Sequence, residues 1–164
     1  MLTTTKVSRV ETEQDRALAL AVLRSTYELE KQWAVRAEDQ FPAADLYTTR
    51  VSWLVVTQGS HPAGVLRVHY EPPVTQYHAY DIKLLRPGLD VQGFLADNRI
   101  AEIGRFAVSP EQRRNLLLAV ALMRAATRET VERGYTHFIT DVFEGDPHSP
   151  YHFHTRVMGF LPVA

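Results

Sequence analysis

A carboxylate and two arginines are the residues most able to do chemistry in this chain. Glu102 stands in EIGRFAV (102–108), a segment otherwise rich in apolar residues. A carboxylate there is costly to bury unless it is paired or lies at a wet cleft. It can then serve as a general base, directly or through a water molecule. Arg105 and Arg67 are either its structural ion-pair partners or groups that grip a substrate carboxylate.

The segment after this strand has the form of a phosphate-binding turn without its glycines. PEQRRNLLL (110–118) joins a predicted strand to a predicted helix. Unpaired N–H groups and the helix dipole favour an anion in front of the first turn. Arg113, Arg114 and Asn115 occupy the positions where glycine would bring the backbone close to a diphosphate. The alternative is a plain capped helix that packs on a sheet.

The histidines near the C-terminus admit a metal interpretation. His148, His152 and His154 follow an HxxxHxH spacing, and Asp146 is near them. The chain lacks an HExxH pattern, however, and we expect no metal site. The absence of cysteine excludes a thiolate nucleophile, a disulfide framework and a cysteine-based metal site.

Composition places these residues in one ordinary globular domain spanning 1–164. Of the 164 residues, 45% are hydrophobic and 23% charged, with a net charge of -1. This balance gives no reason to expect nucleic acid or an anionic membrane as partner. The polar N-terminus is no signal peptide, and no apolar run is long enough to span a bilayer. We therefore expect a cytoplasmic protein.

The predicted elements follow the order βαββ, a long loop, then βαβα. Thr12 is the expected N-cap of the first helix. Ser109 with Gln112 forms a capping-box pattern, Pro110 sits at the first helical position, and Gly134 ends that helix. Strands are predicted at 5–10, 51–56, 63–70, 99–108 and 136–143, the last of them buried. One or two helices are predicted at 11–33, a helix at 110–133, a short helix at 148–158 and an irregular segment at 71–98. The predicted class is α/β (α+β), a mixed central sheet flanked by helices.

Three motifs resemble a known superfamily. VSPEQRRNLLLAVALMRAATRETVERGY (108–135) is similar to the acyl-CoA-binding segment of the GCN5-related N-acetyltransferases (GNAT). YHFHTRVMGFLPV (151–163) is similar to their closing helix, which ends in aromatic-x-x-x-x-Gly-Phe. EIGRFAV resembles the Glu-x-x-Arg-Phe strand of the acyl-homoserine-lactone synthases and the related N-acyl amino acid synthases. The resemblance implies the GNAT fold.

The resemblance also implies roles for individual residues. Glu102 and Arg105 would act in catalysis, and His154 or Tyr151 would protonate the leaving thiolate, with Thr155 the choice if the register shifts by one. The acceptor would be bound by Arg24, Trp33, Asp39, Asp45 and Arg67. The acyl thioester would lie along Phe106, Ala107, Val108, Arg113, Arg114, Asn115 and Leu116.

Alternation along the strand places Glu102, Gly104 and Phe106 on one face. A bulge, common at this place in the superfamily, would alter that phase.

These roles predict an N-acyltransferase that moves an acyl group from a thioester to the amine of a small amino-acid-like acceptor. No covalent intermediate is needed, in keeping with the absence of cysteine. The thioester co-substrate would be acyl-CoA or a phosphopantetheinyl acyl carrier protein, with no tightly bound cofactor. The alternatives are an acetyl-CoA-dependent N-acetyltransferase and a non-catalytic binding domain on the same fold.

Two features depart from the synthases. Gly104 stands where they often have a small hydroxyl residue, and only Leu161–Ala164 follow the Gly-Phe motif. The last strand is therefore expected to be short or missing. Two explanations then stand open: a second subunit in a homodimer covers the sheet edge, or the chain is cut short.

Overall fold

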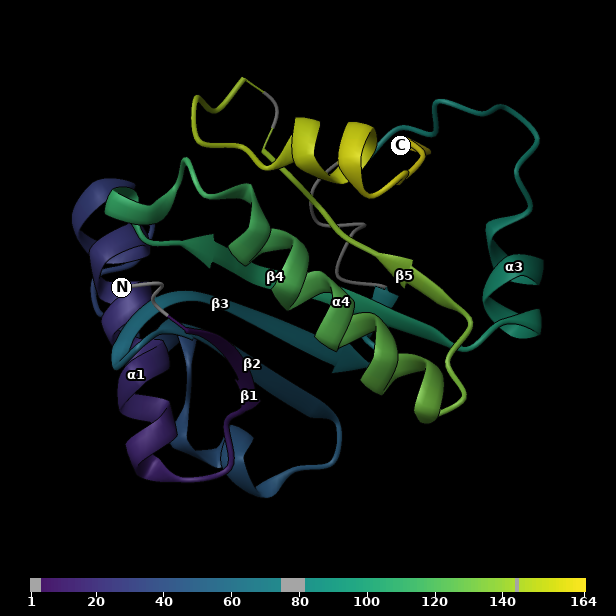
Figure 1. The fold of residues 1–164 in the computed structure, drawn as a ribbon. Helices are drawn as coiled ribbons and strands as arrows, with labels where there is room; N and C mark the ends of the chain where they lie inside the picture. The colour runs from purple at the N-terminus through teal and green to yellow at the C-terminus, as the bar shows by residue number, and fades with distance from the viewer. Residues whose placement is uncertain (1–3, 75–81, 144) are drawn as a thin grey trace.

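A five-stranded mixed sheet forms the centre of the molecule. The computed structural model describes residues 4–74, 82–143 and 145–164. The strands follow in the order β1 (Thr5–Arg9), β2 (Val51–Gln58), β3 (His61–Tyr70), β4 (Ile100–Val108) and β5 (His137–Ile139) (Figure 1). Neighbours are antiparallel except β5, which runs parallel to β4. The predicted fold class is thereby confirmed.

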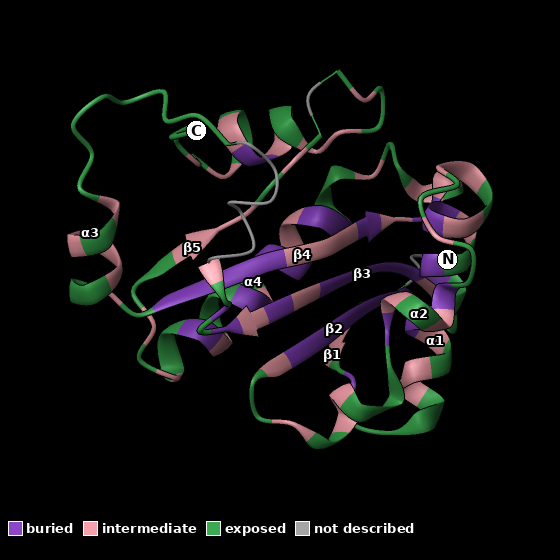
Figure 2. Ribbon diagram, turned by 180° about the vertical axis from the view of Figure 1, so that it is seen from behind, coloured by how far each residue is buried: buried purple, intermediate pink, exposed green. Residues whose placement is uncertain are grey.

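Helices cover both faces of this sheet. One face carries α1 (Glu13–Leu23), a π-helical continuation (Arg24–Glu30) and the short α2 (Ala37–Gln40) (Figure 2). The other face carries α4 (Leu116–Glu132), which ends before Gly134 at a φ of 76°. Thr12 caps α1 as expected, in a capping box that Asp15 completes. A 3₁₀ turn (Ala43–Tyr47) leads into β2.

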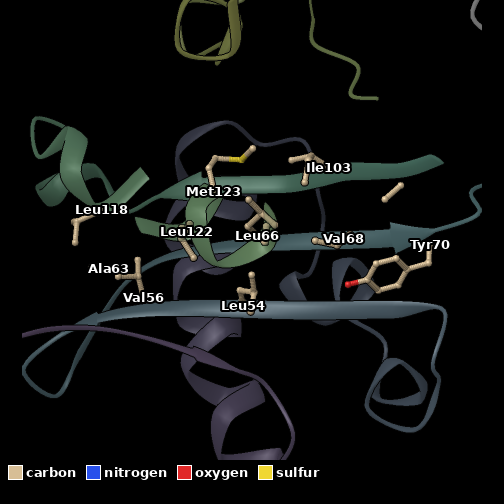
Figure 3. Close-up of a cluster of buried hydrophobic side chains, with 12 residues drawn as sticks. Leu54, Val56, Ala63, Leu66, Val68, Tyr70, Ile103, Leu118, Leu122 and Met123 are labelled. Atoms are coloured by element: carbon tan, nitrogen blue, oxygen red, sulfur yellow. The ribbon is translucent and has the colours of Figure 1, made fainter. Parts of the chain in front are cut away.

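Two apolar clusters lie on the two faces. Leu54, Leu66 and Ile103 belong to the cluster under α4 (Figure 3). Trp53, Val55, Val65 and Phe41 belong to the cluster under α1. Alternate residues of β2 and β3 therefore point to opposite faces, so each side chain of the sheet can be assigned to the α4 face or the α1 face.

A β-bulge in β4 changes that alternation. Arg67 pairs with Gly104, and two residues earlier Val65 pairs with Ala107, so β4 carries one extra residue. Arg105 lies in the bulge at a φ of 51°, in the left-handed region. Phe106 consequently packs against the α4-face cluster. The prediction that Phe106 shares a face with Glu102 is wrong, and the bulge is the reason.

The predicted capping box at Ser109 is also wrong. Pro110–Gln112 forms a separate 3₁₀ turn, and α4 begins only after Asn115. The Ser109 side chain caps neither, whereas its backbone N–H donates to the carbonyl of Ala63 at 2.9 Å. This bond to β3 fixes the chain direction before the helix begins.

The chain after α4 adds only one short strand to the sheet. β5 has 3 residues and is half-buried or exposed, so the prediction of a buried strand over 136–143 is wrong. A π-helical turn (Phe153–Val157) follows, and residues 159–164 form no strand, as expected. The predicted irregular segment contains α3 (Val91–Asp97), and its residues 75–81 lie outside the described residues. Within the described ranges, no helix has the length and apolar character needed to cross a bilayer.

Candidate active site

Glu102 and Arg67 form the centre of the candidate site. Glu102 is 4% exposed, and Nη2 of Arg67 donates to its Oε1 at 2.8 Å. Arg67 and Glu102 therefore form an ion pair. A Cβ added at Gly104 would lie 3.0 Å from this Nη2 and 3.3 Å from this Oε1. The absence of a side chain at position 104 therefore lets the two groups meet.

Arg105 adds a second guanidinium to the same face. Burial, followed by the positive charge of Arg67, lowers the pKa of Arg105 from its ordinary value. Burial raises the pKa of Tyr27 in the π-helical segment, and the positive charges of Arg105 and Arg67 act on the same phenol in the opposite direction. Among the described residues, the buried Nε atoms of Arg67 and Arg105 have no hydrogen-bond partner. Two unpaired guanidinium donors in a buried setting favour an anion between them.

His69 is a member of this site that the sequence analysis missed. It pairs directly with Glu102 across the β3–β4 ladder. Burial, followed by the charge of Arg67, lowers the pKa of His69 below its usual value. The signal was present in RVHY, because Arg67 and His69 stand two residues apart and share one strand face.

Asp45, another predicted acceptor residue, lies within electrostatic range of this cluster. Its Oδ2 accepts a hydrogen bond of 2.8 Å from Nε1 of Trp53, and Trp53 pairs with Arg67 in the sheet. Its charge also raises the pKa of His69, opposing the effect of burial. Asp45 therefore contributes negative potential on the α1 face.

Trp33 lies in an aromatic group beside Tyr27. Its ring makes edge contacts with Tyr27 at 5.4 Å and with Phe143 at 4.9 Å, and it remains 37% exposed. Nζ of Lys31 lies 4.0 Å above the same ring, and burial lowers the pKa of that amine. Trp33 thereby connects the N-terminal segment to the loop after β5.

Arg24 and Asp39 are not brought to the cluster. Nη2 of Arg24 donates to Oε1 of Glu38 at 2.7 Å, and Asp39 is exposed. Both stand on the segment that also carries Trp33, so their predicted roles would require this segment to move over an acceptor.

β4 loses its partner strand beside the cluster. Pairing with β5 ends where Glu102 meets Ile139, and the Thr140 hydroxyl then donates to the carbonyl of Ile103 at 2.9 Å. Beyond that point, residues 104–108 have no strand on this side in the described chain. On that side the stretch, which includes Phe106, Ala107 and Val108, has no ladder partner among the described strands, whereas Gly104, Ala107 and Val108 pair with β3 on the other side.

The turn before α4 is already engaged by protein groups. Nη1 and Nη2 of Arg113 donate to the two carboxylate oxygens of Glu30, and these bonds hold the pKa of Glu30 below its usual range. Arg114 and Leu116 are exposed, and Asn115 donates its backbone N–H to Gln112. A hollow of about 370 Å³ lies behind the turn, lined by Ser109, Glu111, Gln112, His61 and residues of α1. Glu102 does not line it.

The closing helix places His154 in an apolar environment. The imidazole is 2% exposed and lies 5.5 Å from the ring of Phe106 and 5.1 Å from that of Phe160. Burial lowers its pKa to about 4. His154 is therefore neutral at pH 7 and has only an imidazole N–H to donate. Tyr151 is 43% exposed, and its carbonyl accepts a hydrogen bond from Thr155 at 2.8 Å.

The histidines do not assemble a metal site in the described parts of the chain. His148 contacts Arg113, and the His154 ring is surrounded by aromatic rings. No group of three or more histidine, aspartate or glutamate side chains that could hold a metal occurs among the described residues.

Sequence comparison identifies one family. The acetyltransferase (GNAT) family model matches residues 19–160. No curated protein matches the chain in sequence.

Solved structures share the fold at low identity. FeeM, an N-acyl amino acid synthase from uncultured soil microbes, is 14% identical, with a TM-score of 0.64 over 94% of this chain and 76% of its own. A GCN5-related N-acetyltransferase from Ralstonia eutropha JMP134 is 17% identical, with a TM-score of 0.61 over 97% of this chain and 94% of its own. The aminoglycoside acetyltransferase meta-AAC0020, from an uncultured soil metagenomic sample and in complex with sisomicin, is 12% identical, with a TM-score of 0.63 over 96% and 88%.

Proposed function

The chain belongs to the acetyltransferase (GNAT) family and is an acyltransferase, and we propose that it acylates the amine of a small amino-acid-like acceptor. The observation that carries this proposal is a buried carboxylate beside two arginines whose Nε groups lack partners in the described chain. One guanidinium edge would bind the carboxylate of the acceptor. Glu102 would take the proton from its amine, directly or through a water molecule.

The donor thioester would lie along the unpaired part of β4. No described strand pairs with residues 104–108 on the β5 side, and a backbone N–H on that side would polarise the thioester carbonyl. The amine then attacks that carbonyl, the C–S bond breaks, and the leaving thiolate takes a proton. The phenol of Tyr151 is the donor of that proton in this proposal, whereas the neutral imidazole of His154 can only donate a hydrogen bond to the thiolate.

Arg113 and Arg114 mark the phosphate end of the donor. A turn without glycines does not let the backbone approach a diphosphate closely, whereas an arginine can pair with one phosphate. We favour a phosphopantetheinyl carrier protein over CoA for this reason. If CoA at millimolar concentration shifts the melting temperature and a phosphopantetheinylated carrier does not, this preference is wrong.

A second candidate is an acetyl-CoA-dependent N-acetyltransferase of a small amine without a carboxylate. The structural likeness to an aminoglycoside acetyltransferase favours it. A non-catalytic binding domain on the same fold is the third. In each case a homodimer that covers the exposed edge of the sheet is compatible with the short β5.

Thiol release separates these candidates. Acyl-CoA and acyl-carrier donors would be screened against pairs of acceptors, each pair being an amino acid and its decarboxylated amine. We expect faster thiol release with the amino acid of each pair, because only it has an anion for Arg67 and Arg105. Equal rates within pairs would favour the simple amine acetyltransferase, and no release with any pair would favour a binding domain.

A further inference from the structure

Arg113 joins three segments that are far apart in the sequence. Its Nη1 donates to Oε1 of Glu30 at 2.6 Å, and its Nη2 donates to Oε2 of the same carboxylate. Nη1 also contacts Nδ1 of His148 at 3.2 Å. Because arginine has no acceptor atom, Nδ1 of His148 accepts this bond, and the neutral imidazole carries its proton on Nε2.

These contacts leave a defined part of the guanidinium available. Arginine has five N–H donors in a plane, and three of them are used by Glu30 and His148. The remaining two, on Nε and Nη2, have no partner in the described parts of the chain. They lie along one edge of the plane, and such an edge matches two oxygens of a single phosphate.

We propose that Glu30 and His148 are positioning residues that hold Arg113 with its Nε–Nη2 edge ready for the phosphate of a pantetheine donor. This inference rests on the proposed function, since it concerns the donor of the same reaction. A free arginine side chain would lose several rotamers when it binds a phosphate. Here the bidentate bond to Glu30 and the contact with His148 already fix the side chain, so phosphate binding does not cost this conformational entropy.

Glu30 could also have the opposite effect and weaken phosphate binding, because it competes with the phosphate for Arg113. Its carboxylate repels a phosphate, and it occupies two donors that a phosphate also favours. Both effects act on the affinity for the phosphate alone, with opposite signs. A measurement of phosphate recognition therefore distinguishes them.

The probe is the pair of ligands pantetheine and 4′-phosphopantetheine, which differ by one phosphate. Isothermal titration calorimetry gives the ratio of their dissociation constants for each variant. We expect Glu30→Gln to reduce the advantage of the phosphorylated ligand about threefold to tenfold, as expected for the cost of ordering one long side chain. His148→Phe removes an acceptor and should reduce the advantage less, whereas His148→Gln keeps an acceptor oxygen and should preserve it.

Glu132→Gln is the matched control. It removes a glutamate that pairs with an arginine, Arg128 at 4.0 Å, at the opposite end of α4. We expect an unchanged ratio, and unfolding midpoints would show that all variants fold. An unchanged ratio in Glu30→Gln overturns the inference, and a larger advantage shows competition instead. If the unmodified protein does not prefer the phosphorylated ligand, this inference is wrong, while thiol release still decides the acyltransferase proposal separately.

Discussion

Replacing Glu102 by glutamine tests the central step of the proposed mechanism. Glutamine keeps an oxygen that can accept from Nη2 of Arg67, but it removes the negative charge and the basic site. Loss of a positioned general base lowers kcat by about 10²–10⁴. Loss of the charge in a buried hydrogen bond destabilises the fold by about 1–2 kcal/mol, the difference between a charged and a neutral bond.

The assay is thiol release against pH, with kcat and KM determined separately, together with urea unfolding. Glu129→Gln is a matched control, because Glu129 pairs with Arg133 at 2.9 Å and accepts a hydrogen bond from Ser52, which shares the α4 face of β2 with Leu54. We expect the control to lose stability while it keeps its activity. If Glu102→Gln retains kcat within about threefold but loses stability as the control does, the carboxylate is structural and the base assignment is refuted.

Three further predictions follow from the same geometry. Gly104→Ala brings a Cβ to 3.0 Å from Nη2 of Arg67, and we expect it to lower kcat/KM without unfolding the protein, as checked by thiol release and circular dichroism. Burial lowers the pKa of His154 to about 4 from 6.5, so the unfolded chain binds one more proton between these values. Stability should therefore fall by up to roughly 3 kcal/mol as pH drops through this window, and urea unfolding of His154→Phe should lack that dependence. Asp45→Asn keeps the oxygen that accepts from the indole and removes the charge, so we expect a raised acceptor KM, whereas unchanged kinetics would exclude Asp45 from the site.

Local patterns predicted the elements that depend on local contacts. Thr12 caps α1 because its hydroxyl accepts from the backbone N–H of Asp15 and the Asp15 carboxylate accepts from the backbone N–H of Thr12, and the two residues are only three positions apart in the sequence. The β2–β3 hairpin follows from two apolar runs and a polar turn. The same logic failed at Ser109, because a backbone bond to Ala63 on another strand determines the chain direction there. A capping pattern states what a side chain can do locally and says nothing of that competing contact.

The sequence predicted which residue types form the candidate site, but it did not predict which side chains bond to each other. A carboxylate in an apolar strand indicated that a partner was needed, and Arg67 is that partner. Arg113 was expected to face a ligand, yet its guanidinium bonds Glu30, which is 83 residues away. Sequence spacing holds no information about two side chains that only the complete fold brings together.

The bulge in β4 relates these features to one another. A non-glycine residue in the left-handed region costs roughly 1–2 kcal/mol, so Arg105 adopts a φ of 51° only because its surroundings require it. The extra residue turns Phe106 to the α4 face, where it stacks on Phe153 at 5.2 Å. Arg105 itself lies in the electrostatic range of Tyr27 and Glu102. In a regular strand Phe106 would point to the α1 face and Arg105 to the α4 face, so the guanidinium would point away from the carboxylate of Glu102. The strained backbone is thus the feature that places a second cation in the cluster, at the point where β4 becomes free to meet a ligand.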